Sequence, residues 1–156
     1  MSKTLILGMG NTLLRDDAVG IVVAQRLAET VDDDNVDIRP FHVAGFRLVE
    51  ALEGYHKAII VDAIHTGEKE PGEVYWIDLK DLRNSRADRS LHDIHIADAL
   101  DLGRKYDMEM PSEIKILAVE VEDVETWSEH LSEDGRTGVS RAIELITREL
   151  SHDNSD

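Results

Sequence analysis

Short apolar runs alternate with polar stretches along most of this sequence. The apolar runs have the length of β-strands, and one of them, Lys57–Ile64, is almost continuously apolar and rich in β-branched residues. Such a run is typical of a strand that is covered on both faces. The pattern therefore predicts about five strands: Leu5–Leu7, Val36–Phe41, Lys57–Ile64, Val74–Ile77 and Glu113–Glu120.

Between these runs, apolar residues recur at helical spacing. The spacing predicts helices over Val19–Leu27, Leu48–Leu52, Ser90–Leu100 and Val139–Leu150. Alternating strands and helices indicate a three-layer α/β/α sandwich, with a twisted, mostly parallel sheet flanked by helices. We expect Gly135 and Gly138 to precede the last helix, residues 79–89 to form a charged loop and residues 152–156 to form a flexible polar tail. With 156 residues, the chain is expected to be a single domain over 1–156.

Composition removes several classes of function. The formal net charge is −16, from 17 basic and 33 acidic residues, and such a charge repels nucleic acid and anionic membranes. No cysteine is present, which excludes disulfides, thiolate metal ligands and a cysteine nucleophile. No run approaches the length of a membrane span, and the first residues lack the features of a signal peptide. We expect a cytoplasmic protein with no nucleic-acid or membrane partner.

Acidic side chains follow two of the predicted strands. The first strand ends in the turn Gly8–Asn11, and Asp16 and Asp17 then come just before a helix. Acids at this position also stabilise a helix by about 0.3–1 kcal/mol, so their presence alone does not indicate function. Asp62 is less expected, because a carboxylate inside a buried strand needs a partner or a metal. If the first and third strands are parallel neighbours, Asp17 and Asp62 reach the same sheet edge.

A histidine at this edge would complete a metal site. His92 and His95 open the third predicted helix, and two carboxylates with one imidazole suit a divalent ion. Other chemistries lack their motifs: neither Gly-x-Ser-x-Gly nor His-Glu-x-x-His occurs. A nucleotide-binding turn at Gly8–Asn11 is disfavoured, because Asp16 and Asp17 would repel phosphate.

Four segments resemble the hydrogenase maturation endopeptidase family in order and spacing. They are Gly8–Gly20, Ile60–Ala63, Leu91–His95 and Ala118–Val121. The resemblance implies an enzyme that removes a C-terminal peptide from the nickel-loaded large-subunit precursor of a nickel–iron hydrogenase. It implies a metal-binding and catalytic triad of two acids and a histidine, which falls on Asp17, Asp62 and His92. It further implies that the nickel belongs to the substrate, that no organic cofactor is needed and that the protein is a monomer.

Two departures from the family pattern leave alternatives open. Many relatives carry Asp-Gly-Gly-Thr-x-Gly after the second strand, where this chain has Pro40–Gly45. Some relatives have glutamate where this chain has Asp17, so Asp16 stays a candidate ligand, as does His95. The altered Pro40–Val43 loop also keeps open a non-catalytic module that binds or escorts a metal-loaded partner protein.

Overall fold

Five strands form one sheet in the computed structural model, which describes residues 3–42, 46–79 and 91–154. Their order across the sheet is β2-β1-β3-β5-β4. The four strands β2, β1, β3 and β5 are parallel, and β4 is antiparallel to β5. This confirms the predicted mostly parallel sheet, whose strands are β1 (Thr4–Met9), β2 (Val36–Phe41), β3 (Lys57–Ile64), β4 (Val74–Ile77) and β5 (Glu113–Glu120).

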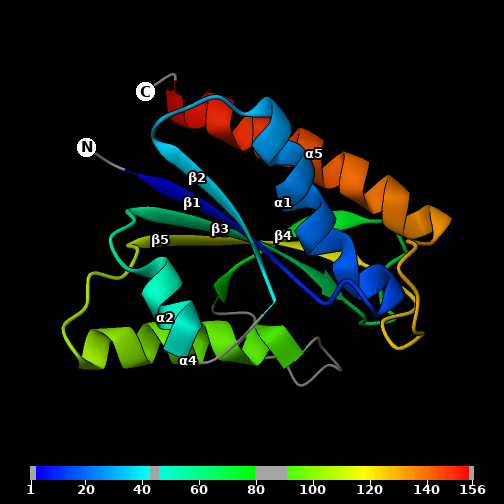
Figure 1. Ribbon diagram of the computed structural model, residues 1–156, viewed down its shortest axis with the longest axis horizontal. Coiled ribbons are helices and arrows are strands. Elements are labelled where there is room, and N and C mark those ends of the chain that lie inside the picture. The colour runs from blue at the N-terminus through cyan, green and yellow to red at the C-terminus, as the bar shows by residue number, and fades with distance from the viewer. Residues whose placement is uncertain (1–2, 43–45, 80–90, 155–156) are drawn as a thin grey trace.

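Helices cover both faces of the sheet, which confirms the three-layer sandwich. Helices α1 and α5 lie on one face, and α2 and α4 lie on the other (Figure 1). The described helices are the 3-10 helix η1 (Arg15–Ala18), α1 (Val19–Thr30), α2 (Phe46–Leu52), α4 (Leu91–Lys105) and α5 (Glu133–Asn154).

The central strands divide the core into two halves because their side chains alternate between faces. On β3, Ala58 and Ile60 pack in the cluster that includes Ile96 and Leu100 of α4. Ile59, Val61 and Ala63 pack in the opposite cluster, with residues of α1 and α5. All eight residues of β3 are buried, as predicted from its apolar sequence.

One local prediction is wrong. Gly135 and Gly138 lie inside α5 instead of preceding it, and the helix continues to Asn154. A Cβ at Gly135 would lie 2.4 Å from Oδ1 of Asp16, and a Cβ at Gly138 would lie 2.5 Å from Cγ1 of Val119. Tertiary packing therefore explains these glycines better than helix breaking. The predicted loop over 79–89 falls almost wholly outside the described residues.

The described helices α1, α2, α4 and α5 run against the parallel strands, and this sets which elements meet at each sheet edge. In Figure 1 the parallel strands run toward the side where α1, α4 and α5 begin. At the opposite edge, the segment after α4 is tied to the start of β3, since the N–H groups of Ser112 and Glu113 both donate to the carbonyl of His56. The first residues of α1, α4 and α5 therefore lie at the carboxyl edge of the sheet.

Among the described helices, none is both long and apolar enough to cross a membrane.

Candidate functional site

Glycines bring the start of α1 against the two central strands. A Cβ on Gly20 would lie 2.3 Å from the carbonyl oxygen of Met9 and 2.4 Å from that of Val61. A Cβ on Gly8 would lie 2.0 Å from the carbonyl oxygen of Gly20. Real side chains do not tolerate such distances, so the helix can approach β1 and β3 this closely only with glycine. The Gly8–Gly20 motif thus has a structural role in packing.

Asp17 lies in η1, one turn before Gly20. Its side chain is buried, and η1 contacts β3. A Cβ on Gly10 would lie 2.0 Å from the carbonyl oxygen of Asp17, so glycine is also needed where the β1 turn passes η1. Gly20 packs against the carbonyl of Val61. Asp17, three residues before Gly20, therefore lies at the same sheet edge as the residue that follows Val61.

That next residue is Asp62, in the last part of β3. It is 2% exposed, and its Oδ1 accepts a hydrogen bond of 2.9 Å from the backbone N–H of Ala63. By strand alternation it lies on the same face as Ala58 and Ile60, the face covered by α2 and α4. The prediction that β1 and β3 are parallel neighbours is confirmed. Asp62 stands near the carboxyl end of β3, and Asp17 lies in η1, which follows β1 and contacts β3.

Asp16 has a different environment from its neighbour. It is 1% exposed; its Oδ1 accepts a 2.8 Å hydrogen bond from the N–H of Ser132, and its Oδ2 accepts a 2.5 Å bond from Oγ of Ser132. Oγ of Ser132 in turn accepts the N–H of Gly135, 3.0 Å away, and so caps the first turn of α5. Both oxygens of Asp16 thus anchor η1 to the start of α5, which indicates a structural role for Asp16.

The histidine candidates stand at the start of α4. His92 and His95 are within the first turns of this helix, but their side chains lie outside the described ones. Ile96, four residues after His92, packs in the cluster on the Asp62 face of the sheet. Four residues correspond to about 6 Å along a helix axis, so the backbone at His92 belongs to the carboxyl edge.

Glu120 is a buried acid whose contacts the sequence did not reveal. It ends β5 opposite Ile64, is 1% exposed, and accepts hydrogen bonds from the N–H and Oγ1 of Thr66, at 2.8 and 2.6 Å, and from the hydroxyl of Tyr75, at 3.1 Å. It therefore fixes the chain directly after β3. Ser132 was missed too, although a serine just before Glu133 and Asp134 is an N-cap pattern that could have indicated it.

A hollow of about 340 Å³ adjoins Asp16. The loop after β5 forms much of its wall, and the N–H of Asp16 donates to the carbonyl of Asp123. Hydrogen bonds from the hydroxyl and N–H of Thr126 and the N–H of Glu125 lower the pKa of Asp123, despite slight desolvation. The wall is therefore predominantly anionic; its residues are Arg15, Asp16, Glu122, Asp123, Ser132 and Asp134.

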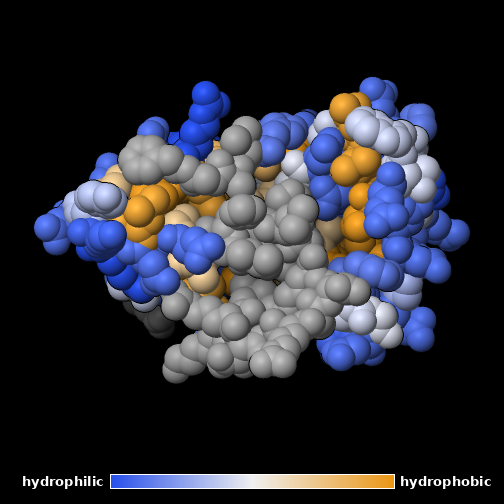
Figure 2. Space-filling view, turned by 90° about the horizontal axis from the view of Figure 1, so that it is seen from below, coloured by the Kyte–Doolittle hydropathy of each residue, from blue (hydrophilic) through white to orange (hydrophobic). Residues whose placement is uncertain are grey.

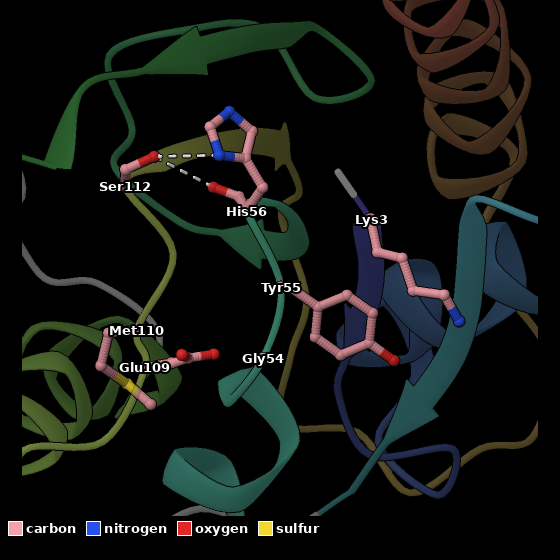
Figure 3. A pocket seen from close by; sticks show the side chains of 7 residues that line it. All are labelled: Lys3, Gly54, Tyr55, His56, Glu109, Met110 and Ser112. Atoms are coloured by element: carbon pink, nitrogen blue, oxygen red, sulfur yellow. Dashed lines mark hydrogen bonds between the residues drawn. The ribbon is translucent and has the colours of Figure 1, made fainter. Parts of the chain in front are cut away.

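A larger hollow, of about 470 Å³, lies at the opposite sheet edge (Figure 3). Oγ of Ser112 lies 3.4 Å from Nδ1 of His56 there, but the hydroxyl also donates to the carbonyl of His56. These bonds hold together the turns that precede β3 and β5. The hollow is thus separated from Asp17 and Asp62 by the length of the strands.

Among the side chains that the structure describes, no three of His, Cys, Asp or Glu are grouped as a metal ion would require. His92 and His95 are outside that set, so Asp17 and Asp62 supply two carboxylate candidates and α4 would supply the third group. Such a mixed oxygen and nitrogen set can balance a divalent charge and leave positions open for substrate.

In α/β proteins with a mostly parallel sheet, ligands usually bind at the carboxyl edge of the strands, the edge near which the buried Asp62 stands. Residues 21–149 match the family HycI, described as hydrogenase maturation protease. The chain belongs to the hydrogenase maturation protease family and is a hydrolase of the endopeptidase type. The matched range contains Asp62 and His92 and begins just after Asp17.

Similar proteins carry the same description. The chain is 28% identical over 125 residues to the Hydrogenase 2 maturation protease of Escherichia coli (strain K12), covering 79% of this chain and 76% of that protein. The solved hydrogenase maturating endopeptidase HybD from E. coli is 26% identical, with a TM-score of 0.83 over 97% of this chain and 93% of that one. The [NiFe] hydrogenase maturation protease HybD from Thermococcus kodakarensis is 26% identical, with a TM-score of 0.74 over 94% and 97% of the two chains. These matches favour the predicted enzyme over the escort module.

Proposed function

We propose that this protein removes a C-terminal peptide from the nickel-loaded large-subunit precursor of a nickel–iron hydrogenase, and that Asp17, Asp62 and His92 recognise the substrate's metal. The observation that carries the proposal is that Asp17, in η1, and Asp62, near the end of β3, are both buried beside two neighbouring parallel strands. The likeness to endopeptidases with [NiFe] hydrogenase in their description supports the substrate class. We propose that it acts as a monomer in the cytoplasm.

The role of the two acids follows from their charge. Two buried carboxylates concentrate negative charge in surroundings of low dielectric constant, where a divalent cation in the substrate would be attracted strongly. Asp62 is held by the N–H of Ala63, and Asp17 is held by the packing of η1, so neither needs to be reorganised when the metal arrives. A neutral His92 at the start of α4 would add the third ligand from the opposite side of the edge.

Metal recognition would make cleavage depend on nickel insertion. Binding of the metal at the carboxyl edge would place the C-terminal extension of the precursor across the same edge, where the scissile carbonyl can be polarised by a nearby cation. A precursor without nickel would lack this attachment and would not be positioned. The triad would thus distinguish filled from empty precursors.

The test is the intact mass of the precursor from the same genome, loaded with nickel or free of it, before and after incubation with the enzyme. Loss of one C-terminal fragment from the loaded precursor alone is expected. Asp17→Asn, Asp62→Asn and His92→Ala should each slow cleavage by at least about 100-fold while the circular dichroism spectrum is unchanged. Unimpaired cleavage by all three variants contradicts the metal-recognition site.

Matched controls separate the triad from general effects of substitution. His95→Ala removes a histidine one turn further along α4, and Asp98→Asn neutralises an exposed acid on the same helix. Both should retain wild-type cleavage. Loss of activity in His95→Ala with retention in His92→Ala would assign the third ligand to His95.

A further inference from the structure

Two large apolar side chains are exposed beside the candidate site. Trp127 is 76% exposed and Leu13 is 45% exposed, whereas nearly all other large apolar residues that the structure describes are at least partly buried. Because the N–H of Ser128 donates to the carbonyl of Leu13, at 2.9 Å, the two residues lie on adjoining backbone segments. We define Leu13 and Trp127 as the Leu13–Trp127 patch.

The patch is held on a fixed backbone. Leu14 and Ser128 form a parallel β-bridge, and the N–H of Arg15 donates to the carbonyl of Ser128 at 3.0 Å. The side-chain carbonyl of Asn11 accepts the N–H of Leu13 and fixes the turn before it. Residues with this much backbone support lose little conformational freedom on binding, which favours affinity.

The patch lies at the same sheet edge as the candidate site. Leu13 precedes Asp17 by four residues, and the N–H of Asp16 bonds the loop that carries Trp127, through the carbonyl of Asp123. Figure 2, seen from the side of α2 and α4, shows hydrophobic residues reaching the surface in separate areas among hydrophilic ones, one of them toward the end where the parallel strands finish. A partner that reaches Asp17 and Asp62 would pass within contact of this patch.

Charge around the patch specifies the chemistry of a partner. From residue 116 to residue 135 the sequence has seven acidic residues and no lysine or arginine. Glu122, Glu125 and Glu129 on the Trp127 loop are exposed, and the lowered pKa of Asp123, held down mainly by the Thr126 hydroxyl, keeps that group ionised. An anionic partner would be repelled here, and a cationic one would be attracted.

We propose that the Leu13–Trp127 patch docks the precursor through an apolar side chain flanked by lysine or arginine, in the segment next to the cleaved bond. Exposed tryptophans are frequent centres of protein interfaces, and acidic groups around such a centre select basic partners. The inference rests on the proposed function, since it gives that substrate a second attachment besides its metal. The patch supplies affinity for the chain, and the triad senses the metal.

The experiment compares kcat/KM for cleavage of the nickel-loaded precursor by the wild type, Trp127→Ala and Leu13→Ser. Removal of a tryptophan at an interface centre should lower kcat/KM about 30-fold. Tyr106→Ala is the matched control: Tyr106 is 64% exposed and follows α4, at the amino edge of the sheet. That variant should stay within about twofold of the wild type, as is usual for surface changes.

A charge test addresses the basic partner. Glu125→Lys with Glu129→Lys should lower kcat/KM about tenfold at low salt, and the difference should shrink as salt screens the charges. The matched control is Glu68→Lys with Glu70→Lys, two exposed acids before β4. A loss that is equal in both pairs would contradict a local basic contact.

The outcomes separate this inference from the proposed function. If the wild type cleaves the precursor and the kcat/KM values of Trp127→Ala and Leu13→Ser are both within twofold of the wild-type value, the docking patch is overturned and the proposed function stands. If the wild type binds the precursor without cleaving it, the proposed function fails; a weakened Kd of Trp127→Ala then supports the patch, and an unchanged Kd overturns it. Neither cleavage nor binding of the precursor overturns both.

Discussion

The link between Asp16 and Ser132 should be a strong and separable contribution to stability. The two residues are 116 positions apart in the sequence, yet they join η1 to the first turn of α5 through two hydrogen bonds of 2.8 and 2.5 Å. Hydrogen bonds to an ionised group contribute about 1.5–3 kcal/mol each. Asp16→Ala should therefore cost about 3–5 kcal/mol of the free energy of unfolding.

Ser132→Ala removes a smaller part of the same network. It deletes the hydroxyl bond to Asp16 and the cap of the N–H of Gly135, but keeps the backbone N–H that bonds Oδ1. We expect a cost of about 2–3 kcal/mol from these two losses. The double variant should cost about 2 kcal/mol less than the sum of the single ones, because the shared hydrogen bond is lost only once.

Urea unfolding at pH 7, followed by circular dichroism, measures all four corners of this cycle. A coupling below about 0.5 kcal/mol would show that the two side chains do not stabilise each other. Cleavage by Asp16→Asn, measured where the variant is folded, tests the same assignment from the side of function. Retained cleavage is expected, and a loss as deep as that of Asp17→Asn would return Asp16 to the metal site.

Two further predictions follow from packing and from charge. Gly20→Ala should lower the free energy of unfolding, measured by thermal unfolding, by more than about 3 kcal/mol, since its Cβ would overlap the carbonyls of two strands. Gly54→Ala is the control: Gly54 has a positive φ and nothing near its Cβ, so the cost should be about 1–2 kcal/mol. Equal costs would refute the packing argument. Glu149 accepts hydrogen bonds from Lys57 and Lys115, at 2.8 and 2.6 Å, and although burial raises its pKa, these bonds outweigh burial and lower it. The ionised Glu149 contributes about 2 kcal/mol of stability above the unfolded carboxyl pKa near 4.5, and this contribution is lost as pH falls through the lower folded pKa. Below pH 4.5 the urea midpoint of Glu149→Gln should therefore fall less steeply with decreasing pH than that of the wild type. Equal slopes would contradict this contribution of Glu149.

The sheet, and the unusual position of Asp62 in it, could be predicted from the sequence because both depend on local signals. An apolar, β-branched run such as Lys57–Ile64 is recognisable as a buried central strand, and a single carboxylate inside it is conspicuous. Pro40 has no N–H to donate to a neighbouring strand, and β2, which contains it, lies at one edge of the sheet. The antiparallel direction of β4 left no such signal, because four residues of alternating character pair equally well in either direction.

Long-range packing explains what the sequence did not reveal. Asp16 and Asp17 are adjacent and chemically identical, and the hydrogen bonds of Asp16 to Ser132, far along the chain, could not be read from the sequence. Gly135 and Gly138 have the composition of a helix breaker, but they lie in α5 because Asp16 and Val119 need the space of their missing side chains. Local propensity is overridden wherever a distant element fills the site of a side chain.

The Gly8–Gly20 motif acquires its meaning from the same kind of packing. A glycine turn before a helix usually suggests phosphate bound at the helix N-terminus. Here Gly8 and Gly20 instead allow close contact between α1 and the strands. That contact places η1 against β3, with one acid fastened to α5 and the next beside the strand that carries Asp62. The glycines thus allow this close packing, and Asp16 holds η1 in place, beside the two acids that we propose for metal recognition, Asp17 and Asp62.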